Sequence, residues 1–334
     1  MRPTISKFPA TRLRRTRQSS AIRALTRQND LSVDDFIWPI FVRSGEGIEE
    51  PIPSMPGVFR RSVDKVVEAA REAADLGIPA ICIFPYTGIE ERTEDCAGAW
   101  DPENHANRAI RAIKAAVPEI AIMTDVALDT YNINGHDGFV ENGEIVNDRT
   151  VEALVKMTLA QAEAGANIIG PSDMMDGRIA SMRSALEDAK YRNVMILSYS
   201  AKYASAFYGP FRDAVGASGA LVGDKKTYQM DPGNSDEALR LIERDLSEGA
   251  DMVMVKPGLP YLDICHRIKE TFGAPTYAYQ VSGEYSMIKA AAQNGWIDEE
   301  RVMMESLMAF KRAGCSGILT YFAPAAARLL AAKR

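Results

Sequence analysis

The sequence alternates short apolar segments with longer amphipathic ones, and this alternation occurs eight times after residue 30. The apolar segments are as short as buried strands, and most of them are continuously apolar rather than alternating. Such strands are typical of a parallel sheet that helices cover. The predicted strands are 38–42, 80–84, 120–126, 167–171, 194–198, 252–256, 276–281 and 318–322.

The segments between the strands have the pattern of helices. Apolar residues recur at helical spacing in 62–76, 149–164, 235–247 and 298–313. Ser62, Ser235 and Asp298 stand where N-cap residues are expected, and glycine follows each helix at 77, 165, 249 and 314. Eight such units predict an α/β fold, a closed (β/α)8 TIM barrel over residues 31–334. A doubly wound open sheet is the alternative.

The loops predict where a functional site would lie. The connections after the second, third and fifth predicted strands are long, whereas the turns from helix back to strand are short. Long loops on one rim are typical of a barrel whose site is at the carboxyl ends of the strands. Polar side chains at those ends are therefore the candidates for chemistry.

The composition excludes several classes of function. The 334 residues are 46% hydrophobic and 25% charged, and the net charge of −6 gives no reason to expect nucleic acid as a partner. No apolar run reaches the roughly 18 residues that span a bilayer, and no secretory signal is recognised, so we expect a cytoplasmic protein without membrane contact. Four scattered cysteines and three histidines do not suggest a disulfide framework, a thiolate zinc site or a Ser-His-Asp triad.

Residues 1–30 differ from the rest of the chain, because arginines crowd into a segment with few apolar residues. These are Arg12, Arg14, Arg15, Arg17, Arg23 and Arg27. On an acidic protein, such a segment is either a disordered tail or an arm that contacts an acidic neighbouring subunit. Nucleic-acid binding is a third interpretation.

Two lysines are predicted at the functional rim. Lys256 ends an apolar strand and is followed by Pro-Gly, while Lys202 comes just past the strand predicted to end at Ser198. Neighbouring strands would bring the two ammonium groups together, and burial and mutual repulsion would lower the pKa of at least one. A free amine in a barrel mouth attacks a ketone or aldehyde to form a Schiff base. Two unrelated surface lysines are the alternative.

Other side chains at this rim suit a substrate with carboxylates. Arg212, Lys225 and Gln229 lie in residues 208–229, a connection that is predicted to be a mobile lid and would clamp a carboxylate as it closes. A solvated basic loop is the alternative. Ser282 and Tyr321 end the last two strands and offer hydroxyls for a second carboxylate.

Acidic residues follow the third and fourth strands. Asp125, Asp129 and Asp137 provide hard oxygen ligands that suit Mg²⁺ or a substrate amine better than zinc. Ser172 stands at the end of the fourth strand. Solvated turn residues would explain Asp129 and Asp137 equally well.

Taken together, these stretches resemble the porphobilinogen synthase (5-aminolevulinate dehydratase) family, in its non-zinc branch. The matching motifs are Ser54–Gly57, Asp125–Asp129, Pro171–Gly177, Ser198–Ser205, Tyr208–Arg212, Tyr228–Asp231, Met254–Gly258, Tyr279–Tyr285 and Thr320–Phe322. They extend over nearly the whole chain. The resemblance implies a (β/α)8 barrel that condenses two molecules of 5-aminolevulinate into porphobilinogen, for tetrapyrrole synthesis, without an organic cofactor.

The resemblance also implies roles for the rim residues. Lys256 would form a Schiff base with the substrate on the propionate side of the product, and Lys202 would bind the second substrate. The expected carboxylate ligands are Ser282 and Tyr321 for the first substrate and Arg212, Lys225 and Gln229 for the second. The family commonly has Arg at the position of Lys225. Lysine keeps the positive charge, but only arginine can bind a carboxylate with bidentate geometry. Asp125 and Ser172 would line the amine end of the site.

Metal binding is expected to differ from that of zinc-dependent relatives. Those carry three cysteines where this chain has Ala127, Asp129 and Asp137, so no catalytic zinc is expected. The residues leave open whether Asp129 and Asp137 hold Mg²⁺ or K⁺ or work without metal. An allosteric Mg²⁺ is implied at Glu237, bound largely through water, with Arg14 associated with it.

The resemblance further implies that the arm, residues 1–30, wraps a neighbouring subunit, in dimers that usually form octamers. Without the resemblance, a class I aldolase or a decarboxylase would also use a Schiff-base lysine in a barrel. A non-catalytic barrel that only binds ligands is a further alternative. Two lysines together with several carboxylate ligands favour an enzyme that joins two acidic substrates.

Overall fold

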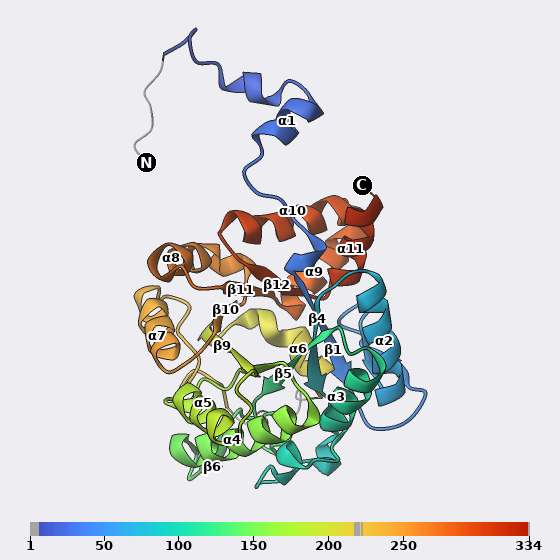
Figure 1. Cartoon of the computed structure of the whole chain (residues 1–334), viewed down its shortest axis with the longest axis vertical. Coiled ribbons are helices and arrows are strands. Elements are labelled where there is room, and N and C mark those ends of the chain that lie inside the picture. The colour runs from blue at the N-terminus through green and yellow to red at the C-terminus, as the bar shows by residue number, and fades with distance from the viewer. Residues whose placement is uncertain (1–6, 217–220, 222, 333–334) are drawn as a thin grey trace.

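The computed structural model describes residues 7–216, 221 and 223–332 and consists of a closed barrel with an extended N-terminal arm (Figure 1). The strands of the barrel are β1 Phe36–Val42, β4 Ala80–Pro85, β5 Ala121–Val126, β8 Ile168–Pro171, β9 Met195–Lys202, β10 Met252–Lys256, β11 Thr276–Gln280 and β12 Gly317–Thr320. Each pairs with its neighbours in parallel, and β12 closes the barrel on β1, with Phe36 opposite Ile318. The predicted (β/α)8 fold is confirmed.

Helices surround the barrel (Figure 1). They are α2 Val63–Asp75, α3 His105–Ala116, α4 Asn147–Ala164, α5 Arg178–Asp188, α6 Gly209–Ala214, α7 Asp236–Ser247, α8 Leu262–Phe272, α9 Ser282–Gln293, α10 Glu299–Arg312 and α11 Ala323–Ala332. Short 3-10 helices occur at η2 Val33–Asp35, η3 Ile89–Glu91, η4 Ala97–Trp100, η5 Ala206–Tyr208 and η6 Leu259–Tyr261. The four predicted helices correspond to α2, α4, α7 and α10.

The helix ends follow the sequence signals only in part. The four predicted C-terminal glycines all have positive φ, for example 110° at Gly165, which L side chains rarely adopt. Asp298 caps α10, because its carboxylate accepts a hydrogen bond from the Arg301 amide. Ser62 and Ser235 do occupy the N-cap positions of α2 and α7, as predicted, but their side chains make no capping hydrogen bond. The Ser62 hydroxyl instead accepts from the Ile48 amide of the preceding loop.

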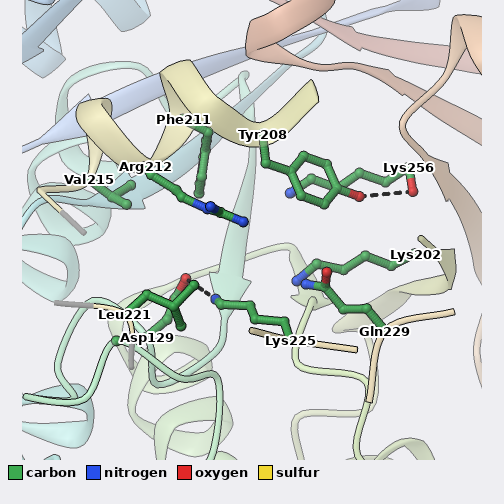
Figure 2. A pocket seen from close by; sticks show the side chains of 11 residues that line it. Asp129, Lys202, Tyr208, Phe211, Arg212, Val215, Leu221, Lys225, Gln229 and Lys256 are labelled. Carbon is green, nitrogen blue, oxygen red and sulfur yellow. Dashed lines mark hydrogen bonds and ion pairs between the residues drawn. The ribbon is translucent and has the colours of Figure 1, made fainter. Parts of the chain in front are cut away.

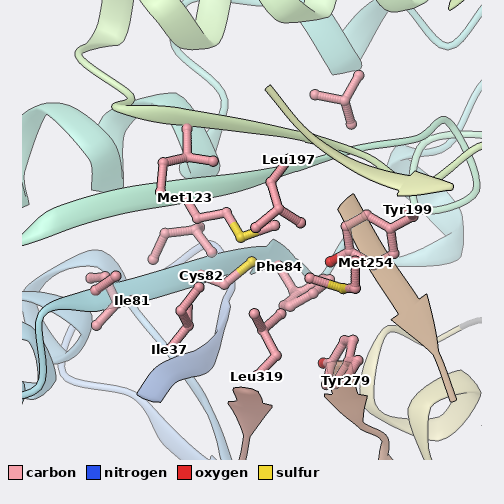
Figure 3. Close-up of a cluster of buried hydrophobic side chains, with 14 of the residues drawn as sticks. Ile37, Ile81, Cys82, Phe84, Met123, Leu197, Tyr199, Met254, Tyr279 and Leu319 are labelled. Atoms are coloured by element: carbon pink, nitrogen blue, oxygen red, sulfur yellow. The ribbon is translucent and has the colours of Figure 1, made fainter. Parts of the chain in front are cut away.

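The barrel interior is filled by side chains of the strands. Figure 3 shows Ile37, Phe84, Met123, Met254 and Leu319 converging from different strands, and all five are at most 4% exposed. Burial of this apolar surface stabilises the fold by about 25 cal/mol per Å². The packed interior leaves the carboxyl ends of the strands as the place for a site.

Two small hairpins were not predicted. β3 (Phe59–Arg61) pairs in parallel with β1 and in antiparallel with β2 (Glu49–Pro51). β6 (Phe139–Glu141) and β7 (Glu144–Val146) form a separate antiparallel pair in the long connection after β5. Both hairpins are only three residues per strand, which is too short for a clear periodic pattern.

The arm extends away from the barrel of its own chain (Figure 1). It contains η1 (Leu13–Arg17) and α1 (Ser20–Thr26), neither of which has a buried residue. Phe8, Leu13 and Leu25 are 73%, 71% and 81% exposed. Arg12 stacks on the ring of Phe8, 4.2 Å from its centroid, within the arm itself. In the described part of the chain, no helix is long and apolar enough to cross a bilayer.

Candidate active site

The two predicted lysines occupy equivalent positions on neighbouring strands. Lys256 is the last residue of β10 and lies opposite Lys202, the last residue of β9, in the register of the sheet. Neighbouring strands are about 4.8 Å apart, so the two side chains leave the rim side by side. The fifth predicted strand was expected to end at Ser198. That prediction is wrong, because the corresponding strand β9 continues to Lys202. Both lysines are buried, with exposures of 4% and 5%.

Aromatic rings surround the amine of Lys256. Its Nζ lies 4.8 Å from the ring centroid of Tyr279, 4.9 Å from that of Phe211 and 5.5 Å from that of Tyr208. No described side chain or carbonyl accepts a hydrogen bond from this Nζ. Burial, and then the charge of Lys202, lower the pKa of Lys256 to about 7. A large share of this amine is therefore uncharged and nucleophilic near neutral pH.

The amine of Lys202 lies beside hydrogen-bond acceptors, whereas that of Lys256 lies among aromatic rings. Lys202 Nζ donates a hydrogen bond to the carbonyl of Ser172 and lies 3.4 Å from Asp137 Oδ1. Figure 2 shows the Lys202 side chain below that of Lys256 and close to that of Gln229. A carbonyl and a carboxylate both stabilise the charged form of an amine. The structure thus gives the two lysines opposite electrostatic surroundings.

A buried cluster of charges adjoins Lys202. Lys225 Nζ lies 2.7 Å from Asp137 Oδ2 and 3.2 Å from Asp129 Oδ2 (Figure 2 shows the latter pair), and Tyr228 donates a hydrogen bond of 2.9 Å to Asp137. Burial by itself would raise the pKa of Asp137, but Lys202 and Lys225 outweigh it and hold this pKa well below its usual range. Burial would lower the pKa of Lys225, but Asp129 and Asp137 raise it above its ordinary value.

Asp125 lies near the end of β5 and is 6% exposed. Burial, and then the charge of Asp129, raise its pKa to about 7, although Lys256 and Lys202 act in the opposite direction. Within the described residues its Oδ1 has no hydrogen-bond partner. Asp125 and Lys256 thus both change charge near neutral pH, which is the range that proton transfer at such a pH requires.

A pocket at this rim combines most of the predicted cations. Its lining includes Lys202, Lys256, Arg212, Lys225 and Gln229. Figure 2 shows Arg212 and Phe211 projecting from α6 toward the lysines, and the described residues offer Arg212 no acidic partner. The predicted lid lies only partly within the structure, because residues 217–220 and 222 are outside the described ranges.

Ser282 and Tyr321 are buried beside this pocket but do not line it. Ser282 is the first residue of α9, and its hydroxyl is buried without a partner in the described structure. The Tyr321 hydroxyl lies 2.7 Å from that of Tyr279, whose ring faces Lys256. Burial raises the pKa of Tyr321 well above its ordinary value, so its hydroxyl remains a hydrogen-bond donor.

The structure does not bring Arg14 and Glu237 together within one chain. Arg14 lies in the exposed arm, whereas Glu237 is in the first turn of α7 and accepts a 2.7 Å hydrogen bond from Asn234. Among the described residues, no group of three or more His, Cys, Asp or Glu side chains is arranged to hold a metal ion.

Sequence reasoning missed several residues of the site. Tyr208 and Phe211 form part of the aromatic wall around Lys256, and the ion pairs of Lys225 were not anticipated. Two aromatic residues in one short segment after a strand are a weak signal for such a wall. Nothing in the sequence pairs Lys225 with Asp129, because 96 residues separate them.

Comparisons with known proteins agree with this geometry. The family described as "Delta-aminolevulinic acid dehydratase" matches residues 10–329. The enzyme of that name from Rhodobacter capsulatus is 62% identical over 325 residues, which are 97% of this chain and 98% of that protein. The one from Synechocystis is 52% identical over 328 residues, with 97% and 99% covered.

A solved structure is similar over the same length. It is a crystal structure of the delta-aminolevulinic acid dehydratase (porphobilinogen synthase) of Toxoplasma gondii in complex with the reaction product porphobilinogen. The two structures superpose with a TM-score of 0.94 at 46% identity, covering 97% of this chain and 92% of the other. This chain therefore belongs to the delta-aminolevulinic acid dehydratase family.

Proposed function

We propose that this protein condenses two molecules of 5-aminolevulinate to porphobilinogen with loss of two waters, a step of tetrapyrrole synthesis. The observation that carries the proposal is the pair Lys202 and Lys256, which lie side by side in register at the barrel rim and have different neighbours around their amines. Two amines suit two ketone substrates. The family membership and the product-bound relative support the same reaction.

Lys256 is the proposed nucleophile for the first substrate. Its uncharged amine attacks the ketone carbon, the new C–N bond forms, and the ketone oxygen takes up protons and leaves as water. Asp125, whose pKa burial raises to about 7, is suited to exchange protons at this end of the site. Lys202 binds the second substrate, also through its ketone, and Ser172 with Asp125 lines the amine end.

The carboxylate ligands are proposed from the family motifs and from their polar groups in or near the pocket. Ser282, with a buried and unpartnered hydroxyl in the described structure, and Tyr321 would hold the first substrate. Arg212, Lys225 and Gln229 would hold the second. Arg212 has no acidic partner in the described region and is free to bind, whereas Lys225 already contacts two aspartates and would share its charge with them.

We propose that the reaction proceeds without catalytic zinc. Ala127 has no donor atom in its side chain, and Asp129 and Asp137 are hard oxygen ligands that bind zinc poorly beside a competing ammonium. Lys225 pairs with both carboxylates and offsets part of their charge. Dialysis against a zinc-selective chelator should leave the rate of pyrrole formation unchanged, and restoration of a lost rate by added zinc would overturn the proposal.

An outer Mg²⁺ is proposed at Glu237, with Arg14 as an associated residue. The Glu237 carboxylate is partly exposed, and a single carboxylate suits Mg²⁺ that keeps most of its waters. Bound there, Mg²⁺ would supply charge to the outer surface rather than take part in the chemistry. After chelation, titration with Mg²⁺ should change activity or assembly of the wild type but not of Glu237→Ala, and indifference of both proteins would contradict the site.

The arm is proposed to contact a second copy of the chain. It is basic and exposes Phe8, Leu13 and Leu25, whereas the remaining chain is acidic overall. Such an interaction would produce the arm-wrapped dimers, and from them octamers, of a cytoplasmic enzyme. Light scattering should find an oligomer for the full chain and a smaller species after removal of residues 1–30, and equal masses would exclude this role.

The proposed reaction has one direct test. The protein is incubated with 5-aminolevulinate, reduced with borohydride and digested, and adducts are located by mass spectrometry. Adducts are expected at Lys256 and Lys202, together with formation of a pyrrole product. Absence of both adducts, or pyrrole formation by Lys256→Ala, would contradict the proposal.

A further inference from the structure

A buried carboxylate lies directly behind the Lys256 loop. Glu284, in the first turn of α9, is fully buried, and the described residues provide it with no cationic partner. Its Oε2 accepts a 2.7 Å hydrogen bond from the Val281 amide, and its Oε1 accepts a 2.6 Å bond from the Leu259 amide. A third bond, of 3.3 Å, comes from the Gly258 amide.

These three amides belong to two different loops of the functional rim. Gly258 and Leu259 follow Lys256 by two and three residues, while Val281 directly precedes Ser282. The bond to Val281 alone would be an ordinary cap of α9. The two other bonds leave the helix and reach the end of β10, so one carboxylate joins the loop of the nucleophile to the loop of a proposed carboxylate ligand.

The surroundings leave this loop little freedom. A Cβ at Gly258 would lie 2.9 Å from the Tyr279 carbonyl, and the Tyr208 hydroxyl donates a 3.1 Å hydrogen bond to the Lys256 carbonyl. Burying a carboxylate without a counter-charge is costly. Burial raises the pKa of Glu284 to about 7, while the three amides act in the opposite direction. A neutral side chain at position 284 would avoid the cost of burying a charge, but it would accept fewer hydrogen bonds from the three amides.

We propose that Glu284 is a positioning residue, which fixes the Lys256 backbone relative to Ser282 so that the amine meets the ketone while the substrate carboxylate is held. The inference rests on the proposed function of Lys256 and Ser282. Because reacting groups must be held within fractions of an ångström, loss of this link should reduce the rate of the first Schiff base more than substrate binding. Lys202, on β9, should be affected little.

Glu284→Gln tests this directly, since the amide keeps the size but turns an NH₂ group toward amide donors. Borohydride trapping with 5-aminolevulinate is timed at each lysine by mass spectrometry. Trapping at Lys256 should slow at least tenfold, trapping at Lys202 should stay within twofold, and kcat should fall more than KM rises. Glu270→Gln is the matched control, because Glu270 is exposed on α8 and its carboxylate makes no hydrogen bond or ion pair within the described residues; it should behave as the wild type.

General destabilisation would slow trapping at both lysines, so it would not explain a selective effect at Lys256. Equal slowing of trapping at both lysines, or no slowing at either, overturns the proposal. Glu284→Asp, which keeps the charge but is shorter, should lie between Gln and the wild type. If neither variant folds, hydrogen exchange in the wild type decides: the Gly258 and Leu259 amides should exchange about 100-fold slower than in an unstructured peptide, and exchange at the peptide rate overturns the link.

These results can be separated from failure of the proposed function. If the wild type forms pyrrole and is trapped at Lys256 while Glu284→Gln is unaffected, only the positioning role is wrong. If the wild type is trapped at neither lysine, the proposed function itself is wrong.

Discussion

Lys256 and Lys202 lie opposite each other in register, yet their surroundings differ. Lys256 Nζ faces aromatic rings and has no hydrogen-bond acceptor among the described residues, whereas Lys202 Nζ donates to the Ser172 carbonyl and pairs with Asp137. Position on the barrel therefore does not determine the surroundings of an amine. The neighbouring side chains do, because rings from β11, α6 and η5 surround Lys256, whereas Ser172 and Asp137 supply acceptors to Lys202.

The largest expected effect concerns the nucleophile itself. Lys256→Ala should reduce kcat for pyrrole formation at least about 10⁴-fold, because removing a covalent nucleophile abolishes its step. Lys226→Ala is a suitable control, since Lys226 is exposed and, among the residues that the structure describes, forms an ion pair only with Asp224. Product is measured colorimetrically with a pyrrole reagent. Activity of Lys256→Ala within tenfold of the wild type would show that Lys256 has no distinct role as the nucleophile.

Asp137→Asn should make the surroundings of Lys202 more like those of Lys256. The change removes a buried carboxylate that contacts both Lys202 and Lys225. Leaving buried ammonium groups without their partner should cost about 3 kcal/mol of unfolding free energy, which urea denaturation would measure. Trapping at Lys202 should become faster, because its Nζ loses one of its two acceptors and is freer to reach a ketone. Slower or unchanged trapping would contradict this account of Lys202.

Lys202→Met should shift the pH dependence of Lys256. Burial is the main cause of the low pKa of Lys256 and the charge of Lys202 is the second, so removing that charge should raise this pKa. Trapping at Lys256 falls as the amine becomes protonated, so its midpoint should move from about 7 to higher pH. Trapping measured between pH 5.5 and 9.5, in steps of about half a unit, tests this. If the pH midpoint of trapping at Lys256 stays unchanged or moves to lower pH, repulsion by the charge of Lys202 is excluded as a cause of the low pKa.

The smallest effect is expected at Tyr228. Tyr228→Phe removes the hydrogen bonds of the hydroxyl to the Asp137 carboxylate, the Asp137 amide and His136 Nδ1, while both lysine contacts of that carboxylate remain. Stability should fall by about 1 kcal/mol, and trapping at either lysine should change less than twofold. A change as large as that of Asp137→Asn would mean that the hydroxyl, rather than the ammonium groups, controls Asp137.

The sequence predicted the barrel because its signal is local and repeated. Apolar strands and C-terminal glycines recur along the chain, and each unit could be recognised without knowing its neighbours. The end of β9 was missed for the opposite reason. The run Ser198-Tyr199-Ser200 resembles a turn, but the Ser198 hydroxyl bonds to buried Asp245, and this residue lies 47 positions away.

The site was predictable in its residue types but not in its connections. Lys256, Lys202 and Arg212 follow from their places after strands and from the family motifs, and they line one pocket. The pairing of Lys225 with Asp129 and the link from Glu284 to Leu259 depend on loops that meet only in the folded chain. The first contact raises the pKa of Lys225, whereas the second fixes the loop that follows Lys256, and neither has a local signal in the sequence.

The most direct test compares the two lysines in the unmodified protein. With 5-aminolevulinate and borohydride at pH 7, the initial rate of adduct formation is measured separately at Lys256 and at Lys202. Trapping is expected to be faster at Lys256, with a rate that falls as the pH is lowered through about 7. Trapping at Lys202 as fast as or faster than at Lys256 would contradict it.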